Sequence, residues 1–332
     1  MKLHLAILGL LTAVCLPSTA ADTVPRDTSF TVWSTAVKVR KKHPGQQVMK
    51  PELPKGVTAR EDMVYCHFDN TPFGPRDLHA DVYKPEGQER HPAVIMIHGG
   101  GWNSGDKTLQ RPMAQRLAAR GYVAIPIEYR LIPEALYPAG LHDVKTAIRW
   151  VRSHADSLGV DPDRIAVWGC SAGAQLATLA GVTNGSARHE GSGPWADTSS
   201  DVQAIVNLDG IATFVSPENI ADSNDYFIKR GKLHVNATWL GGLYLYSTDN
   251  WNEASAINWI TDHSAPACFI NSTLPRYCDG CAEMRQLYSQ RGIHSEHHVI
   301  DVDVHPFWFF HPWADEALDH ATAFLDSTLK QR

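Results

Sequence analysis

The stretch that decides the fold is Gly169-Cys170-Ser171-Ala172-Gly173, which lies between an apolar run at residues 164–168 and a small-residue run at residues 174–179. A G-x-S-x-G pattern between a buried strand and a helix is typical of a nucleophile elbow, where small flanking residues allow a sharp turn that raises the serine hydroxyl clear of the sheet. The pattern therefore predicts that Ser171 is a catalytic nucleophile.

A second motif, His98-Gly99-Gly100-Gly101-Trp102, follows an apolar strand expected at residues 93–97. Glycines let the backbone approach a substrate with unusual φ, and the residue after the nucleophile lies at a helix N-terminus, where the dipole favours negative charge. We expect the backbone N–H groups of Gly100, Gly101 and Ala172 to face an oxyanion. Alone, the glycine run is compatible with a flexible turn, but beside the elbow it indicates an acyl-transfer serine hydrolase.

A serine nucleophile needs a base to take its proton and an acid to hold the tautomer of that base. In hydrolases that have a nucleophile elbow, the catalytic histidine lies in a loop after the last strand of the sheet. His305 has that position, because it follows a strand expected at residues 297–300. We therefore predict His305 as the base, with His311, which is otherwise a structural histidine at the start of the last helix, as the alternative.

The acid has two candidates, and the chain order of nucleophile, acid and histidine permits both. Asp209 ends a strand expected at residues 202–208, whereas Asp279 is the first carboxylate after the next strand, at residues 267–271. A turn or cap role before Gly210 is the other interpretation of Asp209. We expect Asp209 to be the acid and keep Asp279 open.

Alternating strand and helix patterns over residues 61–332 predict one α/β catalytic domain with a mostly parallel sheet covered on both faces. Residues 22–60 are polar and proline-punctuated and are interpreted as an N-terminal arm, and residues 210–262 interrupt the alternation as a partial cap-like insertion. Strands are expected at 63–68, 78–83, 93–97, 122–128, 164–168, 202–208, 267–271 and 297–300, and helices after the elbow and at 109–120, 141–153, 281–291 and 312–329.

Residues 1–21 have the charged start, apolar middle and small-residue end of a signal peptide, so we expect a secreted or periplasmic protein. The net charge of -6 does not indicate binding to nucleic acid. No stretch after residue 21 is long and apolar enough for a membrane anchor. Cys278-Asp279-Gly280-Cys281 is a single C-x-x-C pattern without a second one, so we expect no metal. The sequence does not indicate an oligomeric state.

Taken together, the chain resembles the α/β-hydrolase superfamily, and in its middle the branch that contains hormone-sensitive lipase and feruloyl-esterase-like proteins. The resemblance covers roughly residues 60–325. It implies an α/β-hydrolase fold with an eight-stranded sheet, and esterase chemistry on a free serine without a metal or another cofactor. The residues that carry it are His98 to Trp102, Glu128-Tyr129-Arg130-Leu131-Ile132-Pro133-Glu134, Tyr137-Pro138-Ala139 with Asp143, and Asp161 to Gly173.

The C-terminal third is similar to bacterial esterases associated with pectin breakdown, through residues 269–272, Pro275-Arg276 and the aromatic run at residues 305–313. It departs from the usual branch because no Asp follows the strand at 267–271 closely. Trp102 and Trp308, together with Trp313, are candidates for sugar-stacking walls. Arg276 is a candidate for a bidentate pair with a uronate carboxylate, although an exposed Arg is more often a solvated charge.

These observations predict an exported carbohydrate esterase whose partner is a polysaccharide ester of the plant cell wall. Ser171, His305 and Asp209 would cleave a methyl or acetyl ester through an acyl-enzyme, with pectin preferred. An acetylxylan or feruloyl esterase is the enzymatic alternative. A catalytically inactive binding module is a further alternative, because a fold does not imply a function.

Overall fold

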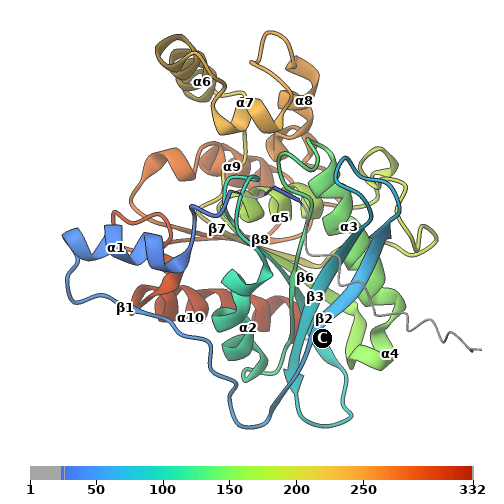
Figure 1. Ribbon diagram of the computed structural model, residues 1–332. Helices are drawn as coiled ribbons and strands as arrows, with labels where there is room; N and C mark the ends of the chain where they lie inside the picture. Colours follow the sequence, from blue (N-terminus) through green and yellow to red (C-terminus); the bar gives the residue numbers. More distant parts are fainter. Residues whose placement is uncertain (1–23, 26, 331–332) are drawn as a thin grey trace, which may run out of the picture.

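The sheet at the centre of the computed structural model has eight strands in the order β2-β3-β5-β4-β6-β7-β8-β9 (Figure 1). β2 and β3 pair antiparallel with each other and β3 pairs antiparallel with β5, whereas all pairs from β5 to β9 are parallel. The predicted fold class is therefore confirmed. The strands are β2 (Val57–Phe68), β3 (Arg76–Pro85), β4 (His91–Ile97), β5 (Val123–Ile127), β6 (Val160–Cys170), β7 (Ala204–Leu208), β8 (Ala267–Asn271) and β9 (Ser295–Val299).

The structure describes residues 24–25 and 27–330, so the predicted signal peptide at residues 1–21 lies outside the described residues. Within the described part, no helix has the length and apolar character needed to cross a membrane. The described cysteines, from Cys66 to Cys281, are all unbridged.

Two hydrophobic cores lie on opposite faces of the sheet, because side chains alternate along each strand. In β6, Ile165 and Val167 belong to one core and Ala166 and Trp168 to the other. Both cores are covered by helices, as the alternating sequence pattern predicts. The first is covered by α3 (Ala139–Ser153), α4 (Ala155–Leu158), α5 (Ala172–Val182) and α9 (Cys281–Gln290), and the second by α1 (Val32–Lys42), α2 (Arg111–Ala118) and α10 (Trp313–Leu325).

The segment between β7 and β8 forms a helical cap, drawn at the top of Figure 1. It contains α6 (Pro217–Arg230), α7 (Val235–Trp239) and α8 (Thr248–Glu253). Trp239 and Trp251 of this cap are almost fully buried against the domain core. Burial of these two large rings, each removing much apolar surface from water, holds the cap on the sheet edge.

The N-terminal arm is tied to the domain by a short two-stranded sheet. In it, β1 (Gln47–Val48) pairs antiparallel with β10 (Phe310–His311). The predicted boundary at residue 60 falls inside β2, which already begins at Val57, so the domain starts earlier than expected because β2 must pair with the full length of β3. The remaining short helices are η1 (Lys107–Gln110), η2 (Ala187–His189), η3 (Ala256–Trp259), η4 (Pro275–Tyr277), η5 (Phe307–Phe309) and η6 (Asp326–Lys330).

Candidate active site

Ser171 lies at a strained turn between β6 and α5, with φ 55° and ψ −121°. Such a conformation is rare for a residue with a side chain, and it persists only where the surroundings enforce it. A Cβ on Gly169 would lie 2.0 Å from the carbonyl oxygen of Gly173, and one on Gly173 would lie 2.2 Å from that of Ile97. Both glycines of the motif are therefore required for the turn that presents the Ser171 hydroxyl.

Three side chains form one hydrogen-bonded series at the carboxyl ends of the parallel strands. The Ser171 hydroxyl donates to Nε2 of His305 over 2.7 Å, and Nδ1 of His305 donates to Oδ2 of Asp209 over 3.0 Å. This is the geometry in which a neutral imidazole takes the proton of a serine while a carboxylate holds its tautomer. The structure thus brings together the three residues predicted for catalysis.

Asp209 is 1% exposed, and its carboxylate accepts hydrogen bonds from the end of β8 and from the loop after it. The backbone N–H and the hydroxyl of Ser272 donate to it over 2.8 and 2.7 Å, and the Asn271 amide donates over 3.4 Å. The end of β8 and the loop after it therefore supply hydrogen-bond donors to the Asp209 carboxylate. Neither Asn271 nor Ser272 was predicted to support the acid, although a polar Asn-Ser pair at the end of a buried strand is a usable signal.

The alternative acid and the alternative base both lie in other networks. Asp279 accepts a hydrogen bond from the Ser216 hydroxyl at 2.5 Å and another from the side-chain amide of Asn219, at the start of α6. His311 pairs with Asp315 at 2.5 Å. Neither contacts the Ser171 hydroxyl, and Asp279 instead anchors the cap.

Two aromatic rings enclose His305. Tyr277 stacks on its face and Trp308 meets it edge-on, with centroids 5.1 Å apart. Burial lowers the pKa of His305, while the hydrogen bond and charge of Asp209 raise it and the nearby positive charge of Arg276 lowers it. The imidazole is therefore kept in the neutral form that can accept a proton.

Trp308 is not at a substrate-binding wall, which corrects the prediction from the aromatic run. It is 2% exposed and is absent from the residues that line the pocket. In the short helix η5, Phe307, Trp308 and Phe309 pack into the second core. The Trp308 ring therefore contacts His305 from the side of the core. Trp313, the other C-terminal candidate, packs on His43 and Phe310 and does not line the pocket either.

A pocket of about 690 Å³ opens over Ser171 and His305. Gly100, Gly101 and Ala172, the residues expected to bind the oxyanion, line it. The φ values of Gly100 and Gly101 are 127° and 61°, a region that favours glycine. A Cβ on Gly100 would also lie 2.0 Å from the Ser104 carbonyl oxygen. The second motif therefore forms the tight loop that the sequence predicted.

Trp102 and Arg276 also line the pocket, as expected for substrate contacts. Trp102 is 5% exposed and stacks on Trp239 of the cap, with centroids 4.6 Å apart and an angle of 12° between the rings. Its Nε1 donates to the Gln175 side chain over 3.2 Å. Trp102 is thus a fixed wall at the bottom of the pocket, whereas Arg276 is exposed at its rim.

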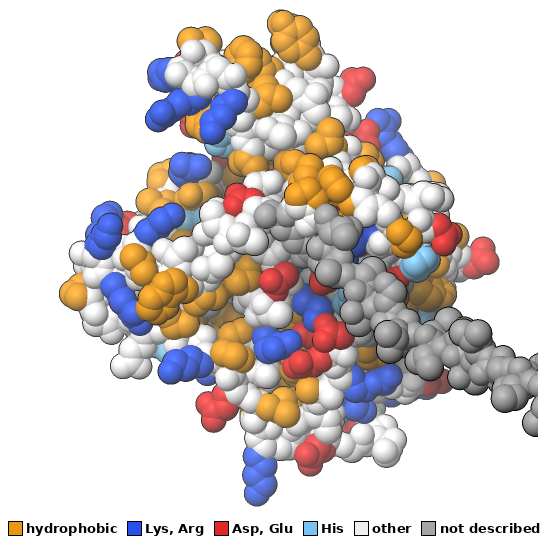
Figure 2. Space-filling model, in the orientation of Figure 1, with side chains coloured by type: hydrophobic (Ala, Val, Ile, Leu, Met, Phe, Trp, Pro, Cys, Tyr) orange, Lys and Arg blue, Asp and Glu red, His pale blue; other side chains and the backbone are white. Residues whose placement is uncertain are grey.

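The outer wall of the pocket is one face of α6, which the sequence analysis did not identify. The residues of this face recur at helical spacing, and most are polar or charged. Lysines and arginines gather over α6 and α1 on the left of Figure 2. The α6 wall comprises Asn219, Asp222, Asp225, Tyr226, Lys229 and Arg230.

Comparison with known proteins agrees with this geometry. A model of the BD-FAE family matches residues 80–276, which include the oxyanion loop, the elbow and Asp209. Esterase LipC of Mycobacterium tuberculosis is 40% identical over 152 residues, 44% of this chain and 37% of LipC. The matched stretch thus spans little more than a third of the length of the curated relatives.

Solved structures extend the likeness to most of the chain. The apo form of Thermogutta terrifontis esterase 2 is 26% identical, with a TM-score of 0.66, and the match covers 83% of this chain and 96% of that one. A truncated carbohydrate esterase from gut microbiota shares the fold, at 23% identity and a TM-score of 0.65, over 82% of this chain and 97% of that one. With its elbow, its glycine loop and the family match over more than half its length, the chain belongs to the BD-FAE family of α/β-hydrolases.

Proposed function

We propose that this protein is a serine carboxylesterase that cleaves acyl groups from carbohydrate. The observation that carries the proposal is the bonded series of Ser171, His305 and Asp209 at the bottom of a pocket with a polar outer wall. A catalytically inactive binding module would have no need for a strained serine held 2.7 Å from a neutral imidazole.

The reaction follows from the positions of these groups. His305 takes the proton of Ser171 as the hydroxyl oxygen attacks the ester carbonyl, and the N–H groups of Gly100, Gly101 and Ala172 stabilise the resulting oxyanion. His305 then returns the proton to the departing alcohol, which leaves an acyl-enzyme. A water molecule activated by the same imidazole then hydrolyses the acyl-enzyme, which releases the acid and regenerates Ser171.

The walls of the pocket favour an ester whose sugar is the alcohol part. The acyl part must lie beside the oxyanion loop, where Trp102 and Val235 are apolar, and a Cβ on Gly101 would be 3.5 Å from Val235. The α6 wall offers hydroxyl, amide and charged groups for the rest of the substrate. We therefore favour acetyl or feruloyl esters of a cell-wall polysaccharide, in agreement with the resemblance to feruloyl-esterase-like proteins.

Methyl-esterified pectin is a second candidate, because cations lie at the rim. Arg276 and Arg230 both line the pocket, and Lys229, which lines it too, is paired with Asp225 at 2.7 Å. Uronate carboxylates are good partners for a guanidinium. If pectin is the substrate, Arg276→Ala should raise KM on pectin about tenfold, while KM for a neutral aryl acetate hardly changes.

The identity of the acyl-enzyme separates the two candidates. The protein is mixed in turn with acetylated xylan oligosaccharide, feruloylated oligosaccharide and methyl-esterified oligogalacturonate. Each reaction is quenched in acid, and the mass of the intact protein is measured by mass spectrometry. Gain of an acetyl or feruloyl mass supports the first candidate, whereas gain of an oligogalacturonyl mass supports pectin.

The matched control for this experiment is Ser171→Ala, which should show no added mass and a kcat lower by about three orders of magnitude. Its circular dichroism should equal that of the parent. An unchanged kcat in this variant would contradict the proposed function itself.

We also propose that the protein is exported, because residues 1–21 have the pattern of a signal peptide. The test is the N-terminal sequence of the mature protein recovered from culture medium or periplasm. A mature chain that still begins at Met1 would contradict export.

A further inference from the structure

A cluster of metal-binding side chains lies outside the pocket, on the sheet face that α10 covers. It includes Cys268 of β8 and Glu296 and His298 of β9, whose potential ligand atoms all lie within 4.8 Å of one another. Cys268 is opposite Glu296 in the parallel ladder, and His298 is two residues further along β9. Because side chains alternate along a strand, these three point to the same face of the sheet.

Two more histidines border the cluster. His294, two residues before Glu296, lies 3.0 Å from its Oε1, and His298 lies 3.1 Å from Oε2 of the same carboxylate. The ring of His320 on α10 stacks on that of His298, with centroids 4.0 Å apart and an angle of 17°. Imidazole and carboxylate groups from β9, the residue before it and α10 thus lie beside the buried thiol of β8.

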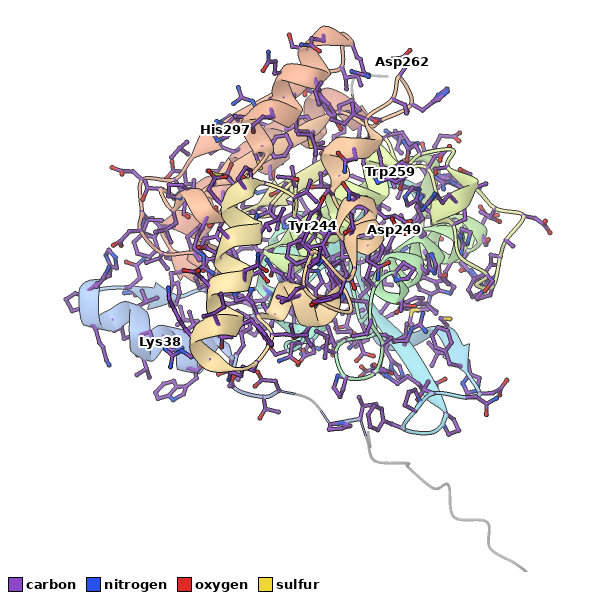
Figure 3. The ribbon with its side chains drawn as sticks, turned by 90° about the horizontal axis from the view of Figure 1, so that it is seen from above. Lys38, Tyr244, Asp249, Trp259, Asp262 and His297 are labelled. Atoms are coloured by element: carbon purple, nitrogen blue, oxygen red, sulfur yellow. The ribbon has the colours of Figure 1, made fainter. Side chains whose placement is uncertain are left out.

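The neighbouring residue His297 marks the opposite face of β9. It is labelled in Figure 3, and its Nε2 lies 3.1 Å from Oδ1 of Asn271, which in turn bonds to Asp209. The strand that would carry the metal ligands on one face therefore contacts the support of the catalytic acid on the other. Beyond β9 the chain leads directly to His305.

The ligand set has the chemistry of a zinc site. Zinc takes thiolate, imidazole and carboxylate ligands in a tetrahedron, with bonds of about 2.0–2.3 Å, so its ligand atoms are about 3.3–3.8 Å apart. The atoms here, within 4.8 Å, reach that spacing by small rotations of side chains.

We propose that Cys268, Glu296 and His298, with a water molecule as the fourth ligand, bind one zinc ion that joins β8 to β9. The ion replaces the thiol proton of Cys268, which passes to solvent. This site is separate from the esterase chemistry and differs from the expectation of no metal, which rested on the single C-x-x-C pattern and on the family resemblance.

The test uses the full chain after treatment with a chelator, titrated with Zn²⁺ alone and with Co²⁺ as a spectroscopic probe. We expect one ion per chain, a thiolate-to-cobalt charge-transfer band and a higher Tm with metal. His298→Ala and Cys268→Ser should each weaken zinc binding by about tenfold or more. Glu296→Gln, at a partly exposed position, is a third variant that tests the site without emptying the core.

The matched control is His67→Ala, because His67 also lies between two carboxylates, Asp69 and Asp77, but on the exposed strand β2. It should bind zinc like the parent, and so should Ser171→Ala, which separates this proposal from the proposed function. Zinc binding that is unchanged in His298→Ala and Glu296→Gln, or a cobalt complex without the charge-transfer band, would overturn the proposal.

Discussion

The ring of Tyr277 lies flat on the ring of His305, with centroids 3.4 Å apart and an angle of 9° between the planes. Tyr277 belongs to the short helix η4, in the same loop after β8 whose Ser272 supports Asp209. The guanidinium of Arg276 lies over the ring of Tyr277, with Cζ 4.8 Å from the ring centroid. One loop therefore positions both the acid and the base.

Tyr277→Ala should lower kcat about tenfold or more with a smaller effect on KM, because an imidazole without its stacking partner spends less time aligned with Ser171. Tyr277→Phe keeps the ring and should restore most of kcat. Steady-state kinetics on an aryl acetate give both values. Equal losses in the two variants would show that the Tyr277 hydroxyl, not stacking, is what matters.

In the pH profile of kcat/KM, the midpoint of the acidic limb should lie below pH about 6.5, the ordinary histidine pKa, because burial lowers the pKa of His305. Activity is lost as pH falls through this pKa, since the imidazolium cannot accept the Ser171 proton. Arg276→Ala removes a positive charge that disfavours the imidazolium, so the pKa of His305 rises and the limb moves to higher pH.

The control for the pH profile is Arg230→Ala, which removes another pocket cation that does not act on the pKa of His305. Its acidic limb should coincide with that of the parent. A limb that moves equally in both variants would mean that general pocket charge, not Arg276, sets the profile.

Asp209→Asn should lower kcat by about four orders of magnitude, because an amide in place of the carboxylate favours the wrong tautomer of His305. Asp279→Asn should retain far more of the activity, since Asp279 bonds Ser216 and Asn219 of the cap and is not joined to His305. The reverse ranking in kcat would transfer the role of acid to Asp279.

Gly173→Ala should lower the free energy of unfolding by about 3 kcal/mol, because the added Cβ would lie 2.2 Å from the carbonyl oxygen of Ile97 in the rigid central sheet. Gly45→Ala is the matched control, since its Cβ would meet nothing within 4 Å. Its stability should change by about 0.5 kcal/mol or less. Urea unfolding curves measure both, and equal midpoints would contradict the steric argument.

Parts of the structure that depend on contiguous residues were predictable. The elbow around Ser171 and the loop at Gly100 and Gly101 are each specified within a few positions, because the steric demand for glycine acts on the local backbone. The central strands β4, β5, β6, β7 and β8 carry apolar runs, so their places were close to those expected.

The cap helices were not predicted, because tertiary packing contributes more to them than periodicity. Buried Trp239 and Trp251 hold the cap in place. The start and end of α6 nevertheless carry local signals, since Ser216 caps its first turn before Pro217 and Gly231 ends it with φ 64°.

The choice between Asp209 and Asp279 was made by tertiary structure. Asp209 and His305 are 96 positions apart in the chain, and only the adjacent placement of β7 and β8 brings the loop of Ser272 around the carboxylate. The inward turn of Trp308 has a similar origin, because η5 packs against a core assembled from distant strands.

The amino-acid sequence by itself therefore predicted the sharp turn at Ser171, the glycine loop at residues 98–102 and the central strands of the sheet, since each depends on neighbours in the chain. Tertiary structure alone decided which acid meets His305, which face of α6 lines the pocket and that His320 meets His298. These are contacts between segments far apart in sequence, and their geometry is set only when the sheet and its covering helices pack together.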